Sequence, residues 1–369
     1  MPDALTVARA QPVLRIDPPQ RILVIRALQL GDLLCAVPAL RALRIAFPAA
    51  QITLAGLPWA REFVARYSRY LDEFIEFPGF PGLPERDCDP RRVPQFLSEV
   101  QGQRFDLALQ LHGSGRLLNP LTMLLGARQC AGYCPADGDC PDPERFFVWR
   151  EAEHEVLRYV RLMRELGIAA CDTALEFPLS RQDREAARAL LAEFDLRGAP
   201  YVCLHAGSQL PSRRWPPERF AAVGDRLAAV GYRILLTGTA AERVLTAQVG
   251  AAMRHTAVDL AGGTSLGALG ALIESAALLI ANDTGVSHIA AALRTPSVIV
   301  CCGSDYRRWA PLDRARHRVL HHAVACRPCR YRVCPIGHPC ATGVPVTQVA
   351  GAARELLYSI ADGGRLCAG

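Results

Sequence analysis

The chain has 369 residues, of which half are hydrophobic and 21% are charged, and this composition excludes fibrous and disordered classes of protein. The length exceeds that of one hydrophobic core and favours two domains. The net charge is +6 and all 42 basic residues are arginine, so an anion site must use guanidinium groups. These arginines are interspersed with 36 acids, a pattern that argues against nucleic-acid binding.

No apolar stretch reaches membrane-spanning length without interruption. The most apolar region, residues 266–281, is broken by Glu274. The first residues carry Arg9, Arg15 and Asp17 and lack the basic-then-apolar layout of a signal peptide. We therefore expect a cytoplasmic protein.

Strands and helices alternate in the first half of the chain. Buried strands are expected at residues 21–27, 51–56, 73–77 and 105–111, with helices at 33–47 and 58–67. Five prolines mark residues 78–94 as a surface loop. The alternation indicates parallel strands joined by crossover helices.

After two helices at residues 151–167 and 181–194, the alternation begins again. Strands are expected at 201–205, 232–236, 278–281 and 297–301, with helices at 217–230, 240–253, 265–274 and 286–293. The chain therefore reads as an α/β protein with two doubly wound halves. The expected domains are residues 20–180 and 198–345, with a terminal helix at 346–362 that packs back on the body.

Ligands of open parallel sheets bind outside the carboxyl ends of the strands, so the loops after strands are the candidate sites. The first such loop holds Gly31 and Asp32 before a helix. Asp32 suits the N-cap of that helix, and it also suits a general base that faces a cleft.

The second loop lies between the strand at 201–205 and the helix at 217–230. Gly207 and Ser208 offer free backbone N–H groups, and Arg213 and Arg214 offer fixed cations. This combination suits a diphosphate. The alternative is an ordinary loop in which the two arginines are solvated.

The third loop joins a buried strand to a helix. Asp283, Thr284 and Gly285 place hydroxyl and amide donors at the positive end of that helix, and His288 lies one turn inside it. A bound phosphate would contact several of these groups. The alternative is that Asp283 or Thr284 only caps the helix and that His288 belongs to the core. None of the loops shows G-x-G-x-x-G or a P-loop, which disfavours a nicotinamide or flavin enzyme.

Together these motifs resemble the lipopolysaccharide heptosyltransferases of glycosyltransferase family 9. The resemblance spans residues 21–356 and rests on RALQLGD at 26–32, VPAL at 37–40, HAGS at 205–208, RRWP at 213–216 and DTGVSH at 283–288. It implies a GT-B fold, in which two Rossmann-like domains face each other across a cleft. The N-terminal domain would hold the acceptor and the C-terminal domain the nucleotide sugar.

The resemblance also implies roles for single residues. Asp32 would be the catalytic base, and Arg213 stands where the family usually has a lysine that contacts the diphosphate. Glu242 stands where the family has a carboxylate that binds ribose hydroxyls. Gly207, Ser208, Asp283, Thr284, Gly285 and His288 would surround the phosphates and the sugar.

The implied activity is inverting transfer of heptose from ADP-heptose to a lipopolysaccharide core acceptor, with no required cofactor. The partners would be the nucleotide sugar, a lipid-linked glycan and, peripherally, the inner membrane. The alternatives are a glycosyltransferase that uses another nucleotide sugar and glycan, a non-catalytic nucleotide-sugar-binding module, and a Rossmann-type oxidoreductase.

A cysteine cluster near the C-terminus stands apart from these motifs. Cys326, Cys329, Cys334 and Cys340, with His338 between the last two, offer enough ligands for a tetrahedral structural zinc site. A redox-labile disulfide and plain loop thiols are the alternatives. No catalytic role is expected for the cluster.

Overall fold

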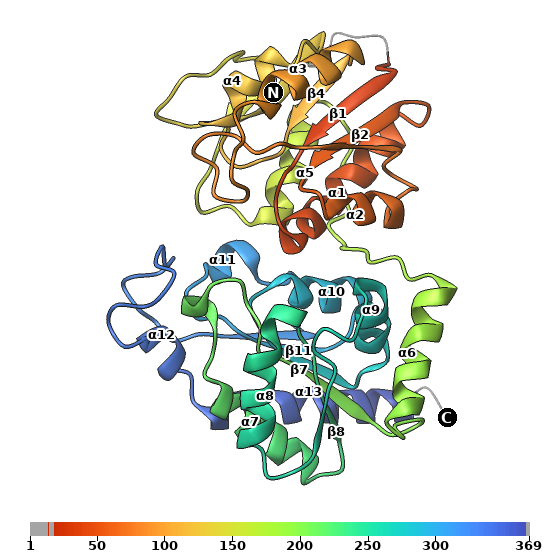
Figure 1. The fold of residues 1–369 in the computed structure, drawn as a ribbon, viewed down its shortest axis with the longest axis vertical. Coiled ribbons are helices and arrows are strands. Elements are labelled where there is room, and N and C mark those ends of the chain that lie inside the picture. Colours follow the sequence, from red (N-terminus) through yellow and green to blue (C-terminus); the bar gives the residue numbers. More distant parts are fainter. Residues whose placement is uncertain (1–13, 15–17, 367–369) are drawn as a thin grey trace, which may run out of the picture. The chain divides into compact units, whose positions relative to one another are not determined.

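The computed structural model describes Leu14 and residues 18–366 (Figure 1). Residues 1–13 and 15–17, which carry the expectation about a signal peptide, lie outside that part. The chain divides into two compact units, Met1–Thr173 and Ala174–Gly369. Of the helices in the described part, none combines the length and apolar character needed to cross a membrane.

The N-terminal unit is built on one six-stranded sheet in which every strand pair is parallel. Its strands are β1 (Arg21–Ile25), β2 (Gln51–Gly56), β3 (Glu73–Glu76), β4 (Leu107–Gln110), β5 (Gln129–Cys134) and β6 (Phe146–Val148). Its helices are α1 (Leu30–Ala46), α2 (Ala60–Arg66), α3 (Arg92–Gly102), α4 (Leu118–Leu124) and α5 (Glu155–Glu165). The strand order is β3-β2-β1-β4-β5-β6.

The C-terminal unit repeats this architecture. Its strands are β7 (Tyr201–His205), β8 (Arg233–Leu236), β9 (Ala257–Asp259), β10 (Leu278–Asn282), β11 (Ser297–Val300) and β12 (His317–Leu320), in the order β12-β11-β10-β7-β8-β9. Its helices are α6 (Arg181–Glu193), α7 (Pro217–Ala228), α8 (Arg243–Ala252), α9 (Leu266–Ser275), α10 (Gly285–Leu293), α11 (Tyr306–Trp309), α12 (Pro339–Thr342) and α13 (Val346–Leu366), with short 3₁₀ turns η1 (Pro211–Arg213) and η2 (Ala240–Glu242). The two parallel sheets confirm the predicted α/β class.

The central strands are buried on both faces, as their continuous apolar sequences require. In β1 and β10, for example, Ile22, Leu23, Leu279 and Ile280 are fully buried. The terminal helix α13 packs against α7 and against β10, β11 and β12, and so belongs to the C-terminal unit. Helix α6 packs against α9 of the same unit.

Helix α1 begins earlier than the sequence indicated. The predicted helix starts at Leu33, with Asp32 as its N-cap, but the structure places the N-cap at Gln29 and the first helical residue at Leu30. Asp32 therefore lies in the first turn of the helix. The half-buried Asp32 side chain is positioned by this first turn, at the N-terminal and positive end of the helix macrodipole.

Each sheet has a point at which the direction of winding reverses. Strand β1 lies between β2 and β4, and β7 lies between β8 and β10. In open α/β sheets the crevice for a ligand opens at the carboxyl ends of the strands on either side of such a point. In the C-terminal unit, these two ends carry the loop after His205 and the loop after Asn282.

Candidate active site

The two candidate phosphate loops of the C-terminal unit are joined by one buried side chain. The Asn282 carboxamide accepts a hydrogen bond from the Trp215 backbone N–H (2.9 Å) and donates one to the Ala206 carbonyl (2.7 Å). Strands β7 and β10 are neighbours in the sheet, with His205 opposite Ala281. The structure therefore brings together the loops at residues 205–215 and 283–288.

Gly207 and Glu242, both named from the sequence, lie against each other. A Cβ at Gly207 would sit 2.2 Å from Glu242 Oε1, so only glycine allows this carboxylate its place. The other carboxylate oxygen, Oε2, accepts hydrogen bonds from the Thr239 backbone N–H (2.9 Å) and hydroxyl (3.0 Å). These bonds fix the carboxylate beside the glycine of the second loop.

Arg213 is held on the short turn η1 beside the third loop. Its Nε is buried and finds no hydrogen-bond partner among the described residues. The guanidinium is close enough to Asp283 to oppose the effect of burial on the pKa of that carboxyl. A half-buried cation with an unused donor, next to a helix N-terminus, is suited to an anionic ligand.

The next residue, Arg214, serves a different purpose. Its Nε donates a 2.8 Å hydrogen bond to the Ser208 carbonyl and so closes the loop on itself. Ser208 is buried, at 5% exposure. Arg214 therefore supports the loop, whereas the Nε of Arg213 has no hydrogen-bond partner among the described residues.

Asp283 follows β10 directly and is engaged by a neighbouring hydroxyl. Burial raises the pKa of its carboxyl, and the hydrogen bond donated by Ser304 (2.5 Å) together with the nearby Arg213 opposes that rise. Arg327 holds the segment that carries Ser304, because its Nη1 donates to the carbonyls of Cys301 and Ser304, each at 3.0 Å.

Thr284, Gly285 and His288 occupy the start of α10. Thr284 is the N-cap residue in extended conformation, and its side chain makes no cap hydrogen bond. Gly285 is the first helical residue. His288 is buried one turn inside, with its ring 6.4 Å from that of Trp309. The first N–H groups of a helix have no partner within the helix, and here they come just after Asp283 in the chain.

In the N-terminal unit, a buried arginine holds the turn that carries Asp32. Arg26 follows β1 and is fully buried. Its Nε and Nη2 donate to the Asp32 carbonyl at 2.9 Å and 2.6 Å, and its Nη1 donates to the Leu111 carbonyl. Because Leu111 directly follows β4, this guanidinium connects the two strand ends at the reversal of the sheet.

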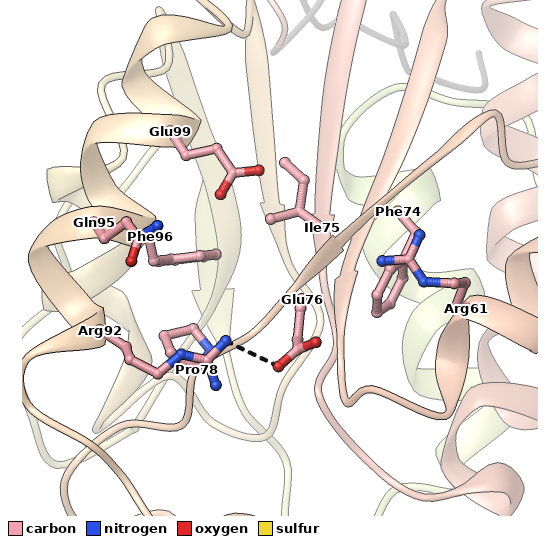
Figure 2. A pocket seen from close by; sticks show the side chains of 9 residues that line it. All are labelled: Arg61, Phe74, Ile75, Glu76, Pro78, Arg92, Gln95, Phe96 and Glu99. Carbon is pink, nitrogen blue, oxygen red and sulfur yellow. Dashed lines mark hydrogen bonds and ion pairs between the residues drawn. The ribbon is translucent and has the colours of Figure 1, made fainter.

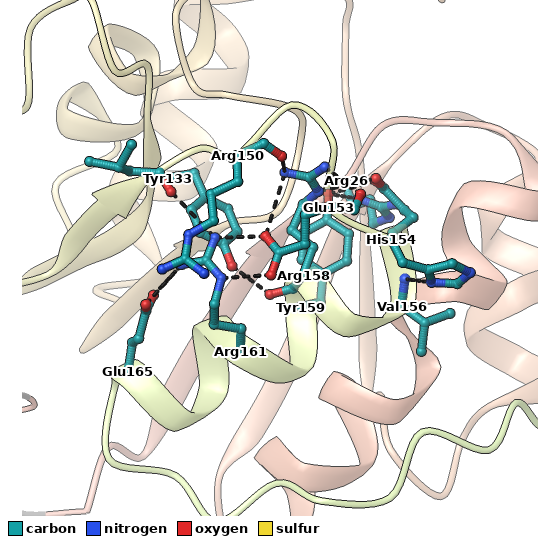
Figure 3. Close-up of polar contacts among 12 residues, drawn as sticks. Arg26, Tyr133, Arg150, Glu153, His154, Val156, Arg158, Tyr159, Arg161 and Glu165 are labelled. Carbon is teal, nitrogen blue, oxygen red and sulfur yellow. Dashed lines mark hydrogen bonds and ion pairs between the residues drawn. The ribbon is translucent and has the colours of Figure 1, made fainter. Parts of the chain in front are cut away.

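Helix α5 supplies the counter-charge for this arginine, and Figure 3 shows Arg26 beside Tyr159 of that helix. Nη1 of Arg26 bonds the Tyr159 hydroxyl at 2.5 Å, Nη2 lies 3.3 Å from Glu155 Oε1, and Tyr159 in turn donates to Glu155 at 3.1 Å. Burial lowers the pKa of Arg26, but Tyr159, Glu155 and Asp32 outweigh burial, so the pKa is raised overall. The guanidinium stays charged and fixed.

A small pocket lies at the edge strand β3 of the same unit (Figure 2). Its volume is about 170 Å³, and it is lined by residues of α2, β3 and α3. Glu76, at the carboxyl end of β3, pairs with Arg92 at 3.0 Å and with Arg86 at 2.9 Å. Arg61 lies over the Phe74 ring, 4.8 Å from its centroid. The pocket thus offers paired carboxylate and guanidinium groups beside aromatic faces.

Zinc binding by the cysteine cluster stays a prediction. In the described part of the chain no three His, Cys, Asp or Glu residues gather in a way that could hold a metal ion. Nε2 of His338 donates to the Ser212 carbonyl (2.8 Å), Cys340 is buried in the hydrophobic core on α12, and Cys326 is exposed. Cys326, Cys329, Cys334 and Cys340 are free thiols in this structure; burial raises the pKa of the Cys340 thiol, and the other three thiols lie near enough to affect it.

Three residues of these sites escaped the sequence analysis or were given no role in it. Asn282 directly follows the strand expected at 278–281, and Ser304 lies outside the expected elements. Arg26 appeared only as part of a motif. A polar residue at the end of a buried strand is the signal that could have identified Asn282 and Arg26, because such a side chain must find a partner.

Two solved glycosyltransferase structures share this fold. The glycosyl transferase family 9 structure from Veillonella parvula matches with a TM-score of 0.77 at 23% identity, covering 92% of this chain and 98% of that one. The Escherichia coli ADP-heptose LPS heptosyltransferase II structure matches with a TM-score of 0.71 at 21% identity, covering 92% and 99%. These neighbours confirm the expected GT-B fold class.

Sequence comparison gives the same result. Lipopolysaccharide heptosyltransferase 1 of Pseudomonas aeruginosa is 27% identical over 85% of this chain and 87% of its own length. Lipopolysaccharide heptosyltransferase 2 of Salmonella typhimurium is 28% identical over 75% and 81%. The model of glycosyltransferase family 9 (heptosyltransferase) matches residues 95–339, which is more than half of the chain. The chain therefore belongs to glycosyltransferase family 9 and is a glycosyltransferase.

Proposed function

We propose that this chain is an inverting heptosyltransferase, which moves heptose from ADP-heptose to a lipopolysaccharide core acceptor. One observation carries the proposal: Asn282 joins the loop that holds Arg213 to the loop that holds Asp283. Both loops lie at the reversal point of the C-terminal sheet. The relatives named as lipopolysaccharide heptosyltransferases support the donor and the acceptor class.

The donor would lie along these two loops. The diphosphate would meet Arg213, the backbone N–H groups of Gly207 and Ser208, and the start of α10 at Thr284 and Gly285. Glu242 would accept hydrogen bonds from the ribose hydroxyls. Asp283 and His288 would face the sugar.

Asp32 would act as the general base. The acceptor hydroxyl oxygen forms a bond to the anomeric carbon while the bond from that carbon to the phosphate oxygen breaks, and the configuration inverts. The hydroxyl proton passes to the Asp32 carboxylate, and ADP leaves with the bonding electron pair. Arg213 and the helix N–H groups stabilise the charge that grows on the leaving diphosphate.

The acceptor would bind to the N-terminal unit. The pocket follows β3 as far as Glu76 at the carboxyl end of that strand, and the first turn of α1 comes after the carboxyl end of β1. Carboxylate and guanidinium groups beside aromatic rings are suited to sugar hydroxyls and to the anionic groups of a glycan. The lipid end of that acceptor would bring the protein to the membrane surface.

The test compares binding with transfer in Asp32→Asn. We expect unchanged ADP affinity by calorimetry and a loss of heptose transfer of about 10² to 10⁴-fold, the usual contribution of a general base. Glu62→Gln is the matched control, because Glu62 is an exposed acid in the first turn of α2. Full turnover in Asp32→Asn would remove this residue as the base.

A thermal-shift screen over ADP-, UDP- and GDP-sugars tests the donor, because a ligand that binds only the native state raises its stability. ADP-heptose is expected to give the largest shift. A larger shift with another nucleotide sugar would favour a different glycosyltransferase of the family. Donor binding without transfer to any acceptor, in the wild-type chain, would favour the binding module.

A further inference from the structure

A short loop of the C-terminal unit exposes large apolar side chains that the proposed transfer reaction does not use. The segment at residues 330–336, here called the basic loop, follows Cys329 and precedes α12. Within it, Tyr331 is 60% exposed, Val333 68% and Ile336 63%. Three large apolar side chains, each more than half exposed within six residues, form an apolar tip on the protein surface.

The charged side chains in the chain segment around this tip are all positive. From residue 314 to residue 354 the sequence contains seven arginines and no aspartate or glutamate. Arg330 and Arg332 alternate with Tyr331 and Val333 and are exposed, and the ion pairs of the described residues do not include either guanidinium. Apolar side chains flanked by unpaired arginines suit a boundary between an apolar and an anionic phase.

The base of the loop is fixed to the body of the unit, so the tip is presented outward. The backbone carbonyls of Tyr331 and Arg332 accept hydrogen bonds from the Ser212 hydroxyl (2.6 Å) and backbone N–H (3.0 Å). The Cys329 N–H donates to the Gly303 carbonyl at 2.7 Å. With the main chain bonded inward, the side chains of Tyr331 and Val333 remain exposed.

A second exposed apolar group, at α4, differs from this tip in its exposure and in its charge. At α4 in the N-terminal unit, Leu117 is 42% exposed and Leu124 58%. The adjacent Arg116 pairs with Asp137, so its charge is compensated within the protein. The basic loop combines greater apolar exposure with uncompensated charge.

We propose that the basic loop docks the protein onto an anionic lipid surface. Tyr331, Val333 and Ile336 enter the headgroup and upper acyl region, while Arg330 and Arg332 bind the lipid phosphates. The inference extends the proposed function, in which the acceptor is lipid-linked, by naming the segment that meets the membrane. It rests on the loop itself and requires no nucleotide or acceptor.

The test is co-sedimentation of the full chain with vesicles of phosphatidylcholine, with and without phosphatidylglycerol, at several salt concentrations. We expect binding to the anionic vesicles that weakens as salt rises, because salt screens the arginine–phosphate attraction. The charge variant Arg330→Gln/Arg332→Gln and the apolar variant Val333→Asn/Ile336→Asn should each bind more weakly by about tenfold or more.

Matched controls separate the loop from the rest of the surface. Arg188→Gln/Arg226→Gln removes the same charge from exposed positions on α6 and α7, and Val244→Asn removes a 73% exposed apolar side chain on α8. Both control proteins should bind vesicles like the wild type. Thermal melting and ADP binding verify that all variants remain folded.

Three outcomes would overturn the inference: no binding of the wild type to anionic vesicles, equal loss in loop and control variants, or a change in oligomeric state of the loop variants by sedimentation velocity without vesicle binding. The last outcome would make the loop an interface between copies of the chain. The Asp32→Asn protein should bind vesicles normally, so failure here and failure of the proposed function are distinguishable.

Discussion

Asn282 and Trp215 are 67 residues apart in the chain and share a 2.9 Å hydrogen bond from the Trp215 backbone N–H to the Asn282 carboxamide oxygen. Asn282 is fully buried and uses its amide nitrogen on the Ala206 carbonyl. One side chain therefore holds both ends of the loop at residues 206–215 against the strand that leads into Asp283. The relative position of the two candidate phosphate loops depends on it.

The variant Asn282→Asp tests this link. It keeps the shape but places a carboxylate oxygen against the Ala206 carbonyl, so we expect the free energy of unfolding to fall by about 3 kcal/mol. ADP affinity should fall about tenfold as well. The control is Asn119→Asp in the N-terminal unit, where the buried Asn119 amide donates to the Tyr133 carbonyl at 2.9 Å. That variant should lose stability in urea and keep its ADP affinity by calorimetry.

Gly207→Ala should weaken nucleotide binding with little effect on folding. The added Cβ would meet Glu242 Oε1 at 2.2 Å, so the carboxylate must move away from the position proposed for ribose. We expect ADP affinity to drop by about fivefold to tenfold, the value of one or two hydrogen bonds. In Gly250→Ala on α8 the new atom meets Leu236 at an ordinary 3.6 Å, and affinity should not change. Equal affinity in both variants would place the ribose elsewhere.

Tyr159→Phe should lower the rate of transfer through Arg26. The change removes the hydroxyl that bonds both Arg26 and Glu155, so the guanidinium that holds the Asp32 turn loses a fixed partner. We expect kcat to fall about tenfold at unchanged ADP affinity, with about 1 kcal/mol lost from the free energy of unfolding. Tyr201→Phe removes a buried hydroxyl that donates to the Leu272 carbonyl in the other unit. If Tyr159→Phe and Tyr201→Phe had a similar kcat, the proposed role of Tyr159 in holding Arg26 would be contradicted.

His317 should make stability fall in mild acid. Burial lowers the pKa of its imidazole to about 4 from the ordinary 6.5, and its Nδ1 lies 2.8 Å from the Ser297 hydroxyl. Because the unfolded chain binds this proton more readily, the stabilisation is complete above pH 6.5 and is lost as pH falls toward 4. The loss reaches about 3 kcal/mol at about pH 4. Urea unfolding of the wild type, measured from neutral pH down to this acid pH, should show this loss in the free energy of unfolding. The His317→Gln variant should not show it.

Much of the fold follows from local sequence pattern. The expected strands at 21–27, 51–56, 201–205 and 278–281 correspond to β1, β2, β7 and β10, each a continuous apolar run. Such runs are visible because a strand buried on both faces needs apolar residues at every position. Short elements between residues 112 and 150, among them β5, β6 and α4, carry weaker signals and were not assigned.

The sequence motifs also identified where chemistry should be sought. Gly207, Arg213, Glu242 and Asp283 were named from strand-to-helix loops and from the family resemblance. In the structure Gly207 lies against Glu242, and Arg213 lies near Asp283. Parallel strands end at the same edge of a sheet, so loops that are distant in sequence meet there as a consequence of topology.

Spacing along the chain does not show the partners of a side chain that lie far away in the sequence. The cysteine spacing predicts zinc, and the structure adds that His338 bonds Ser212 and that Cys340 packs into the core. In the same way, the start of α1 at Leu30 could not be read from Asp32. Periodicity and motifs are local properties, and they determined the α/β class and the candidate loops. Tyr159, Trp215 and Ser212 lie 67 to 133 residues from their respective partners Arg26, Asn282 and His338, so only tertiary packing decided these contacts.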